Sequence, residues 1–174
     1  LAMRIINKII KILTFPSAFL KGFWEQLLCK FMGAPVESKK IFQSGEMAGH
    51  IEHEPFPTAA KSFWFCFVTG FMMFLTGVIF SVPAVINLFY LDTASPILRF
   101  FGFIYLYCAI GAFSNMFPSI EDGLMMWEKF KGMKKGAKVI LAPAAAIMYV
   151  GSFAETWGIT FLTNVLSAAA LLLL

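Results

Sequence analysis

Charged residues are scarce in this sequence. Only 14% of the 174 residues are charged, whereas 59% are hydrophobic, and the mean hydropathy is +0.78. This composition excludes an ordinary soluble domain, because such domains carry roughly 25% charged residues. The net charge of +4 is small and spread over several segments, which argues against a nucleic-acid partner. The sequence therefore predicts an integral, multi-pass membrane protein, without indicating which membrane.

Cysteines and cofactor motifs are also few. Cys29, Cys66 and Cys108 are odd in number and scattered through apolar segments, which excludes a disulfide framework and the spacing of an iron–sulfur ligand set. The sequence has no glycine-rich phosphate loop, haem motif or nucleotide fingerprint. It also lacks repeats and low-complexity linkers. We therefore expect one membrane domain over residues 1–174 and no cofactor.

Long apolar runs are what the sequence does contain. Residues 62–91 and 100–120 carry no charge, and residues 139–174 are interrupted only by Glu155. About 20 apolar residues suffice for a helix to cross a bilayer. The last run allows one long tilted helix or a span followed by a second segment after Gly158; we expect one helix, because residues 155–158 offer only a weak turn. The sequence predicts membrane helices at residues 62–91, 97–117 and 139–172.

A fourth membrane helix is expected at residues 16–34, although this segment contains Lys21, Glu25 and Lys30. A charge at the bilayer centre costs about 3 kcal/mol even on a lenient scale, so these side chains should face protein. The fold class is thus all-α integral membrane, with about four transmembrane helices.

The first 14 residues have an amphipathic pattern. Arg4, Lys8 and Lys11 recur at helical spacing, and isoleucines occupy the other side. This pattern predicts an interfacial helix over residues 1–14 that ends at Pro16. A signal peptide is the alternative, but lysines interrupt its apolar region and no small-residue cleavage site follows.

Lysines set the expected topology. They gather in two connections, residues 39–61 and 121–138, which four spans would place on one side of the membrane. Their excess over the opposite side indicates the cytoplasmic or an equivalent face. The eight lysines concerned are Lys39, Lys40, Lys61, Lys129, Lys131, Lys134, Lys135 and Lys138.

Two short segments carry the motifs of this sequence. The first contains Phe15-Pro16, then Lys21-Gly22-Phe23-Trp24-Glu25, then Cys29-Lys30-Phe31-Met32-Gly33; the second contains Asn115-Met116-Phe117-Pro118 and Asp122-Gly123. Together they resemble the two active-site helices of site-2-protease-like intramembrane zinc peptidases. The resemblance implies a helical membrane core with a short β-hairpin after the first active-site helix, here at residues 37–54. It also implies that Asp122 stands where the family's aspartate completes a zinc site.

The family's H-E-x-x-H motif is missing at the matching positions. Lys21 and Glu25 take the histidine positions and Gly22 takes the position of the general base. A protonated lysine cannot ligate zinc and glycine offers no base. The resemblance therefore implies the family's fold without its reaction. We expect no catalytic or metal-binding residues, with Lys21, Gly22, Glu25 and Asp122 as vestigial positions.

Two hypotheses describe what these positions do. In the first, the Lys21 ammonium replaces the metal cation and ties Glu25 and Asp122 together across two helices. In the second, Lys21 reaches a membrane interface or a water-filled crevice, and Asp122 caps a helix that starts at Gly123.

A cluster of His50, Glu52, His53 and Glu54 lies in the predicted hairpin. A metal site is conceivable, but we expect solvated loop residues. Alternation along a strand would put His50 and Glu52 on one face, and Ile51 and His53 on the other.

The functional expectation is a non-catalytic pseudoprotease that serves as a structural or accessory subunit of a larger membrane complex. Its partners would be other membrane subunits and lipids. The alternatives are a pseudoprotease that binds transmembrane clients, and an active intramembrane zinc protease with unusual ligands.

Overall fold

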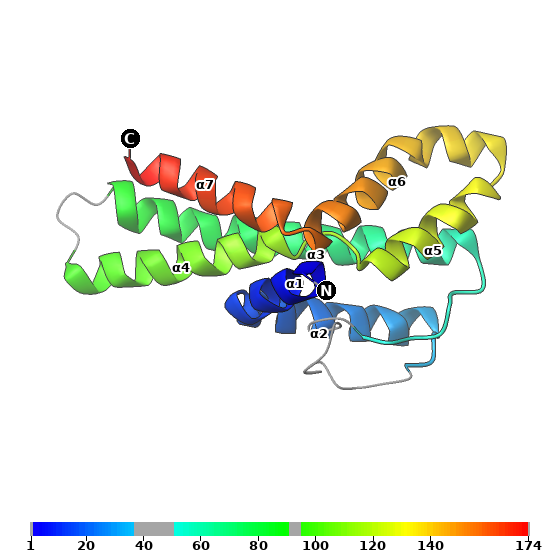
Figure 1. The fold of residues 1–174 in the computed structure, drawn as a ribbon, viewed down its shortest axis with the longest axis horizontal. Helices are drawn as coiled ribbons and strands as arrows, with labels where there is room; N and C mark the ends of the chain where they lie inside the picture. Colours follow the sequence, from blue (N-terminus) through cyan, green and yellow to red (C-terminus); the bar gives the residue numbers. More distant parts are fainter. Residues whose placement is uncertain (1, 37–50, 91–94, 174) are drawn as a thin grey trace.

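Helices make up nearly all of the structure. A computed structural model describes residues 2–36, 51–90 and 95–173 (Figure 1). This confirms the predicted all-α class and the N-terminal helix. The helices are α1 (Ala2–Leu13), α2 (Phe15–Met32), α3 (Ala59–Val85) with a π-helical last turn η1 (Ile86–Tyr90), α4 (Pro96–Ser114), α5 (Ile120–Lys131), α6 (Lys135–Thr156) and α7 (Ile159–Leu173).

Three passes along the long axis form the body of the molecule (Figure 1). Helix α3 makes the first pass without interruption and continues through Pro83 into η1. Helix α4 returns to the middle, where α5 takes over and reaches the end at which α3 began. Helix α6 then comes back to the middle and α7 completes the third pass. Two of the three passes are therefore broken near the middle of the molecule.

The two breaks have local causes. Helix α4 ends at Ser114, and Ser119 caps α5 because its Oγ accepts a hydrogen bond from the Asp122 amide at 3.1 Å. Helix α6 ends at Thr156, and Gly158 has a φ of 74°, a left-handed conformation that glycine adopts without strain. The prediction of one helix over residues 139–172 is therefore wrong. The chain turns at Gly158, although the sequence of residues 155–158 gives only a weak turn signal.

Three helices of the described chain are long and apolar enough to cross a membrane, fewer than the four predicted. They are Ala59–Tyr90, Pro96–Ser114 and Lys135–Thr156. Helix α2 forms close to the predicted place, but its charges keep it out of this set. The connection predicted at residues 121–138 holds a further helix, α5, whose Met126 and Phe130 are buried in the core. This helix begins three residues before Gly123, where one of the sequence hypotheses started it.

Helices α1 and α2 lie along one side of the three passes. The Ser17 hydroxyl of α2 donates to the Cys108 carbonyl of α4 at 3.3 Å. Helix α1 lies near the middle of the long axis (Figure 1), and it turns Lys11 inward while Ile9 and Ile12 are exposed. The basic side of α1 thus meets protein at Lys11, whereas the sequence predicted that it would face water at a membrane interface.

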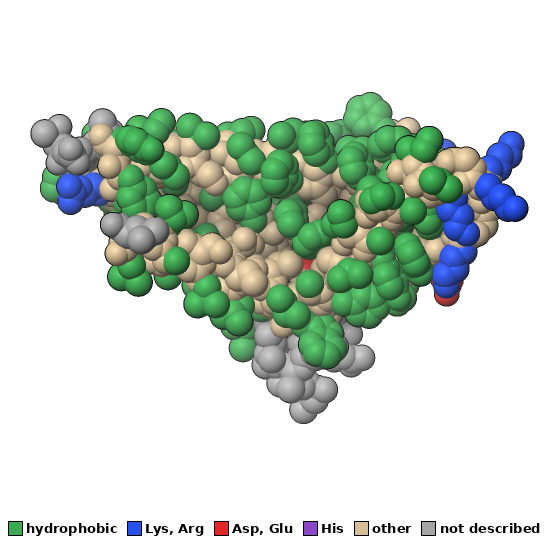
Figure 2. Space-filling view, turned by 90° about the horizontal axis from the view of Figure 1, so that it is seen from above, with side chains coloured by type: hydrophobic (Ala, Val, Ile, Leu, Met, Phe, Trp, Pro, Cys, Tyr) green, Lys and Arg blue, Asp and Glu red, His purple; other side chains and the backbone are tan. Residues whose placement is uncertain are grey.

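Basic and apolar side chains are segregated along the molecule. Apolar side chains cover most of the length, and Lys and Arg side chains gather at the ends (Figure 2). The start of α3, with Lys61, and the connection between α5 and α6 lie at one end, and α7 runs to the other (Figure 1). The three apolar helices are consistent with a multi-pass membrane protein. The side of the membrane predicted from the lysines stays a prediction.

The predicted hairpin falls largely outside the described residues. Residues 37–50, with Lys39, Lys40 and His50, are not among those described. The adjoining segments meet at one antiparallel bridge, Val36 with His53, and the Glu54 amide donates to the Pro35 carbonyl at 3.1 Å. Ile51 and His53 lie on one face, as strand alternation predicted, but both side chains turn inward, whereas His53 was expected in solvent.

Gly70 of α3 permits close packing against the first break. A Cβ built at Gly70 would lie 2.6 Å from the Met116 carbonyl oxygen, a backbone atom that cannot turn aside. We predict that Gly70→Ala lowers the free energy of unfolding by roughly 1–3 kcal/mol, the usual cost of overpacking. Thermal unfolding in mild detergent measures the effect.

Gly136→Ala is the matched control. Gly136 lies in the first turn of α6, and nothing stands within 4 Å of a Cβ there. Alanine favours a helix over glycine by up to about 1 kcal/mol, so this variant should be neutral or slightly stabilised. Equal losses in the two variants would contradict close packing at Gly70.

Candidate functional site

A buried ion pair between α2 and α6 stands at the centre of the molecule. The Lys21 Nζ lies 2.9 Å from the Glu155 Oε1, and the two residues are only 1% and 6% exposed. The Lys11 Nζ lies 2.6 Å from the same oxygen and donates to the Asn115 Oδ1 at 2.5 Å. One carboxylate oxygen therefore holds two ammonium groups, one from α1 and one from α2.

The same ion pair binds the backbone at the break between α4 and α5. The Phe117 amide donates to the Glu155 Oε2 at 2.9 Å, and the Lys21 ammonium donates to the Phe117 carbonyl. Phe117 lies outside both helices, so its backbone groups have no helical partners. A buried backbone group left unpaired costs free energy comparable to a lost hydrogen bond. The two charged side chains supply the partners that the break removes.

Asn115 connects this ion pair to the turn between α1 and α2. Its amide nitrogen donates to the Thr14 Oγ1 at 2.9 Å and to the Gly111 carbonyl at 2.8 Å. The Thr14 hydroxyl in turn donates to the Ile10 carbonyl at 2.9 Å. Thr14 and Asn115 are both fully enclosed. The network therefore holds the α1–α2 turn against the end of α4.

A second set of charged groups adjoins the first. The Asp122 Oδ1 lies 3.3 Å from the His53 Nε2, and its Oδ2 accepts the Ser119 hydroxyl at 2.9 Å. The Glu25 Oε2 accepts the Ile51 amide at 3.0 Å. Burial lowers the pKa of Lys21, but the negative charges of Glu155, Glu25 and Asp122 together outweigh this effect and raise the pKa. Carboxylates from three helices thus surround one ammonium.

The structure brings the four vestigial positions together at the inner face of α2. Lys21, Gly22 and Glu25 are buried there, and Asp122 of α5 is 4% exposed. Two contacts lie outside both sequence hypotheses. Lys21 forms an ion pair with Glu155, and the Asp122 carboxylate lies against His53. Lys21 reaches neither a surface nor a crevice, and Ser119 caps α5, which begins at Ile120.

Sequence reasoning missed Glu155, Lys11 and Asn115 as members of this cluster. In the sequence, Glu155 only interrupts an apolar run, yet a lone carboxylate in such a run is by itself a signal for a buried partner. His53 was expected in solvent, but its side chain is 1% exposed and its ring packs on Phe56 and Phe65 at centroid distances of 4.8 and 4.7 Å. No pattern in the sequence paired it with Asp122.

The cluster suits charge balance better than metal binding. Among the residues that the structure describes, no three His, Cys, Asp or Glu side chains gather closely enough to hold one metal ion. Lys11 lies outside the membrane-spanning helices; burial lowers its pKa, and the attraction of Glu155 opposes that shift. The arrangement holds α1, α2 and α6 around the break between α4 and α5.

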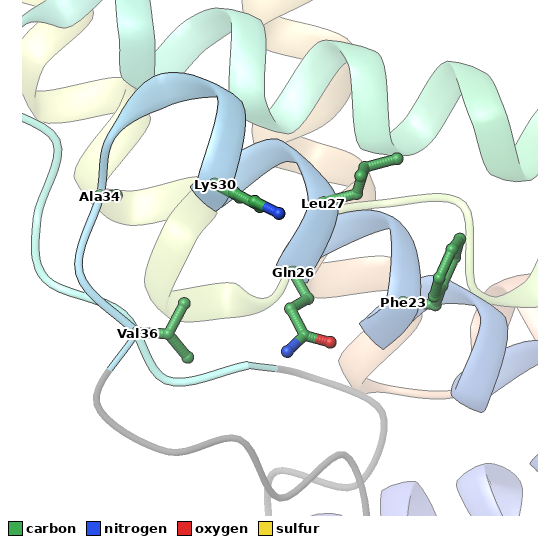
Figure 3. Close-up of a pocket in the computed structure, with 6 residues that line it drawn as sticks. All are labelled: Phe23, Gln26, Leu27, Lys30, Ala34 and Val36. Carbon is green, nitrogen blue, oxygen red and sulfur yellow. The ribbon is translucent and has the colours of Figure 1, made fainter.

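A concave region of about 530 Å³ lies on the outer side of α2 (Figure 3). Exposed Lys30 and partly buried Gln26 give it polar groups, and the rest of its described lining is apolar. The side chains around it come from the face of α2 opposite Lys21 and Glu25 and from the segment that follows. Its described lining comprises Phe23, Gln26, Leu27, Lys30, Ala34 and Val36.

Comparisons with known proteins return nothing: no protein-family model, curated protein or solved structure matches this chain. The resemblance to site-2-protease-like peptidases therefore depends on the motifs and their placement alone.

The central ion pair predicts a large penalty for removing its cation. Lys21→Met keeps most of the length of the side chain but removes one of the two ammonium groups from Glu155 and the Lys21 donor from the Phe117 carbonyl. Breaking a buried pair by deleting one partner costs roughly 3–5 kcal/mol. We predict a loss of that size in unfolding free energy, measured by denaturation in mild detergent.

Lys30→Met controls for this prediction. Lys30 lies on the same helix but is exposed, so the change should stay within about 0.5 kcal/mol. Combining Lys21→Met with Glu155→Gln should cost less than the sum of the two single changes, because the pair is already broken. Additive losses, or equal effects of the Lys21 and Lys30 substitutions, would show that the ion pair contributes little.

Proposed function

We propose that this chain is a non-catalytic pseudoprotease that acts as a structural or accessory subunit of a larger membrane complex. The observation that carries the proposal is the position of the Lys21 ammonium, 1% exposed and 2.9 Å from the Glu155 Oε1. By the motif resemblance, Lys21 takes the place of the first zinc-binding histidine. A fixed ammonium there supplies positive charge without an open coordination position.

Hydrolysis by a zinc peptidase needs a metal-bound water and a general base. Lys21 in its protonated form donates hydrogen bonds and has no lone pair for zinc. Gly22, at the base position, carries no side chain, and Glu25 accepts the Ile51 amide. These residues support loss of the reaction with retention of an electrostatic link between helices.

The outer surface supports an accessory role. Helix α6 packs on α5 with one side, while Val139, Ile140, Ile147 and Val150 on other sides are 63–78% exposed. Little of the described chain lies outside the helices (Figure 1). Helix surfaces in membranes associate by close packing, so these faces are available to lipid or to neighbouring subunits.

The two alternatives receive less support. A client-binding pseudoprotease would need a groove that reaches Lys21 and Asp122, but these residues are 1% and 4% exposed, and the concave region by Lys30 lies on the outer side of α2. An active zinc protease would need ligands beyond Glu25 and Asp122. The burial of the ion pairs of Glu155 with Lys11 and Lys21 favours the structural role.

Zinc content tests the loss of the reaction. The measurement uses protein purified in mild detergent without chelators, together with an Asp122→Ala variant. We expect far less than one zinc per chain in both, because an ammonium occupies the central position. One zinc per wild-type chain that disappears in the variant would make this a metalloprotein and contradict the proposal.

The size of the native particle tests the accessory role. Extracted from its own membrane in mild detergent, the 19.4 kDa chain should elute within a particle several times its mass, determined by light scattering. A harsher detergent should release the single chain and so serves as the control. A single chain in the mild detergent as well would contradict a subunit role without bearing on zinc.

A further inference from the structure

A cavity of about 220 Å³ lies between α3 with η1, α4 and α7, away from the buried charges. The space exists because each of the three helices has a small alanine side chain there: Ala84, Ala109 and Ala168. All three are buried, so the helices are packed around the cavity rather than spread apart. It is a formed feature of the bundle.

The cavity opens on the apolar surface of the molecule. At its rim, Phe89 of η1 and Leu171 and Leu172 of α7 are exposed. Its lining on α7 extends from Asn164 to Leu172, which corresponds to about 12 Å along a helix. Helices α3 and α4 are long and apolar enough to cross a membrane, and in such a membrane this opening would lie beside hydrocarbon. A slot parallel to such helices is also parallel to lipid chains.

The few polar groups of the lining are already engaged. The Ser81 hydroxyl donates to the Gly77 carbonyl and the Ser167 hydroxyl to the Thr163 carbonyl, each at 2.8 Å. The Asn164 amide donates to the Ser114 Oγ at 3.3 Å. A buried water needs two to four polar partners, which this lining does not offer. An empty apolar space of this size would forfeit packing contacts, so an apolar occupant is favoured.

We infer that this cavity binds one acyl chain of a bilayer phospholipid. A helix of 10–12 Å diameter is too wide for a space of about 220 Å³, whereas a single hydrocarbon chain is slender enough to enter it. The surrounding bilayer supplies such chains at the rim. The inference requires only that α3 and α4 cross the bilayer, and it does not depend on the proposed function.

A phosphatidylcholine with a photoactivatable diazirine near the end of one acyl chain tests the inference. The protein is reconstituted in nanodiscs that contain this lipid, irradiated, and mapped by mass spectrometry. We expect labelling of the lining segments of α4 and α7 to exceed labelling of the exposed α6 residues Val139 and Ile140 at least fivefold. Labelling spread evenly over all exposed apolar residues would show only annular lipid and overturn the inference.

Filling the cavity provides the second arm. Ala109→Leu and Ala168→Leu each place a larger side chain in the space and should reduce labelling of the lining at least fivefold. Ala170→Leu on the exposed side of α7 is the matched control and should leave it unchanged. If a filled variant fails to fold, the labelling pattern of the wild-type chain alone tests the inference. A lining protected from label in a dimer would mean that a second copy fills the cavity, which also overturns the inference.

Discussion

The ion pair between Lys21 and Glu155 is the interaction on which the rest of the architecture depends. It joins α2 to α6, and through its contacts with both backbone groups of Phe117 it also holds the break between α4 and α5. In an apolar environment an unpaired backbone group costs several kcal/mol, so an interrupted helix requires replacement partners. Lys21 and Glu155 provide two such partners at one residue, and their mutual attraction offsets the cost of burying each charge.

Small residues complete what the ion pair begins. A Cβ at Gly151 would lie 2.1 Å from the Phe117 ring, and a Cβ at Gly123 would lie 2.5 Å from the Ser152 hydroxyl. The break therefore fits into space that glycines on α5 and α6 leave open. Close backbone approach brings the charged groups within bonding distance, and the hydrogen bonds in turn fix that approach. The close packing of this centre and its ion pairs therefore depend on each other.

Part of this architecture follows from the sequence. Apolar runs of sufficient length predicted α3 and α4, and the motifs around Lys21 and Asp122 predicted that α2 and the segment after Asn115 meet. The number of spans and the break at Gly158 could not be predicted this way, because hydropathy records how apolar a run is and not where the backbone turns. The pairing of Lys21 with Glu155 joins residues 134 positions apart, a separation that no local pattern encodes.

The location of the charges constrains where the molecule can act. Lys21, Glu25, Asp122 and Glu155 are all buried, in a chain with few charges to distribute. Any process that admits a substrate to this centre must separate ion pairs that hold three helices together, at a cost of several kcal/mol for each uncompensated charge. In the proposed function, this centre acts as a structural support. Apolar helix faces, the concave region by Lys30 and the cavity beside Ala168 lie on the outside of the described chain. Partners and lipids, as proposed, would bind there, while the charged centre keeps those faces in place.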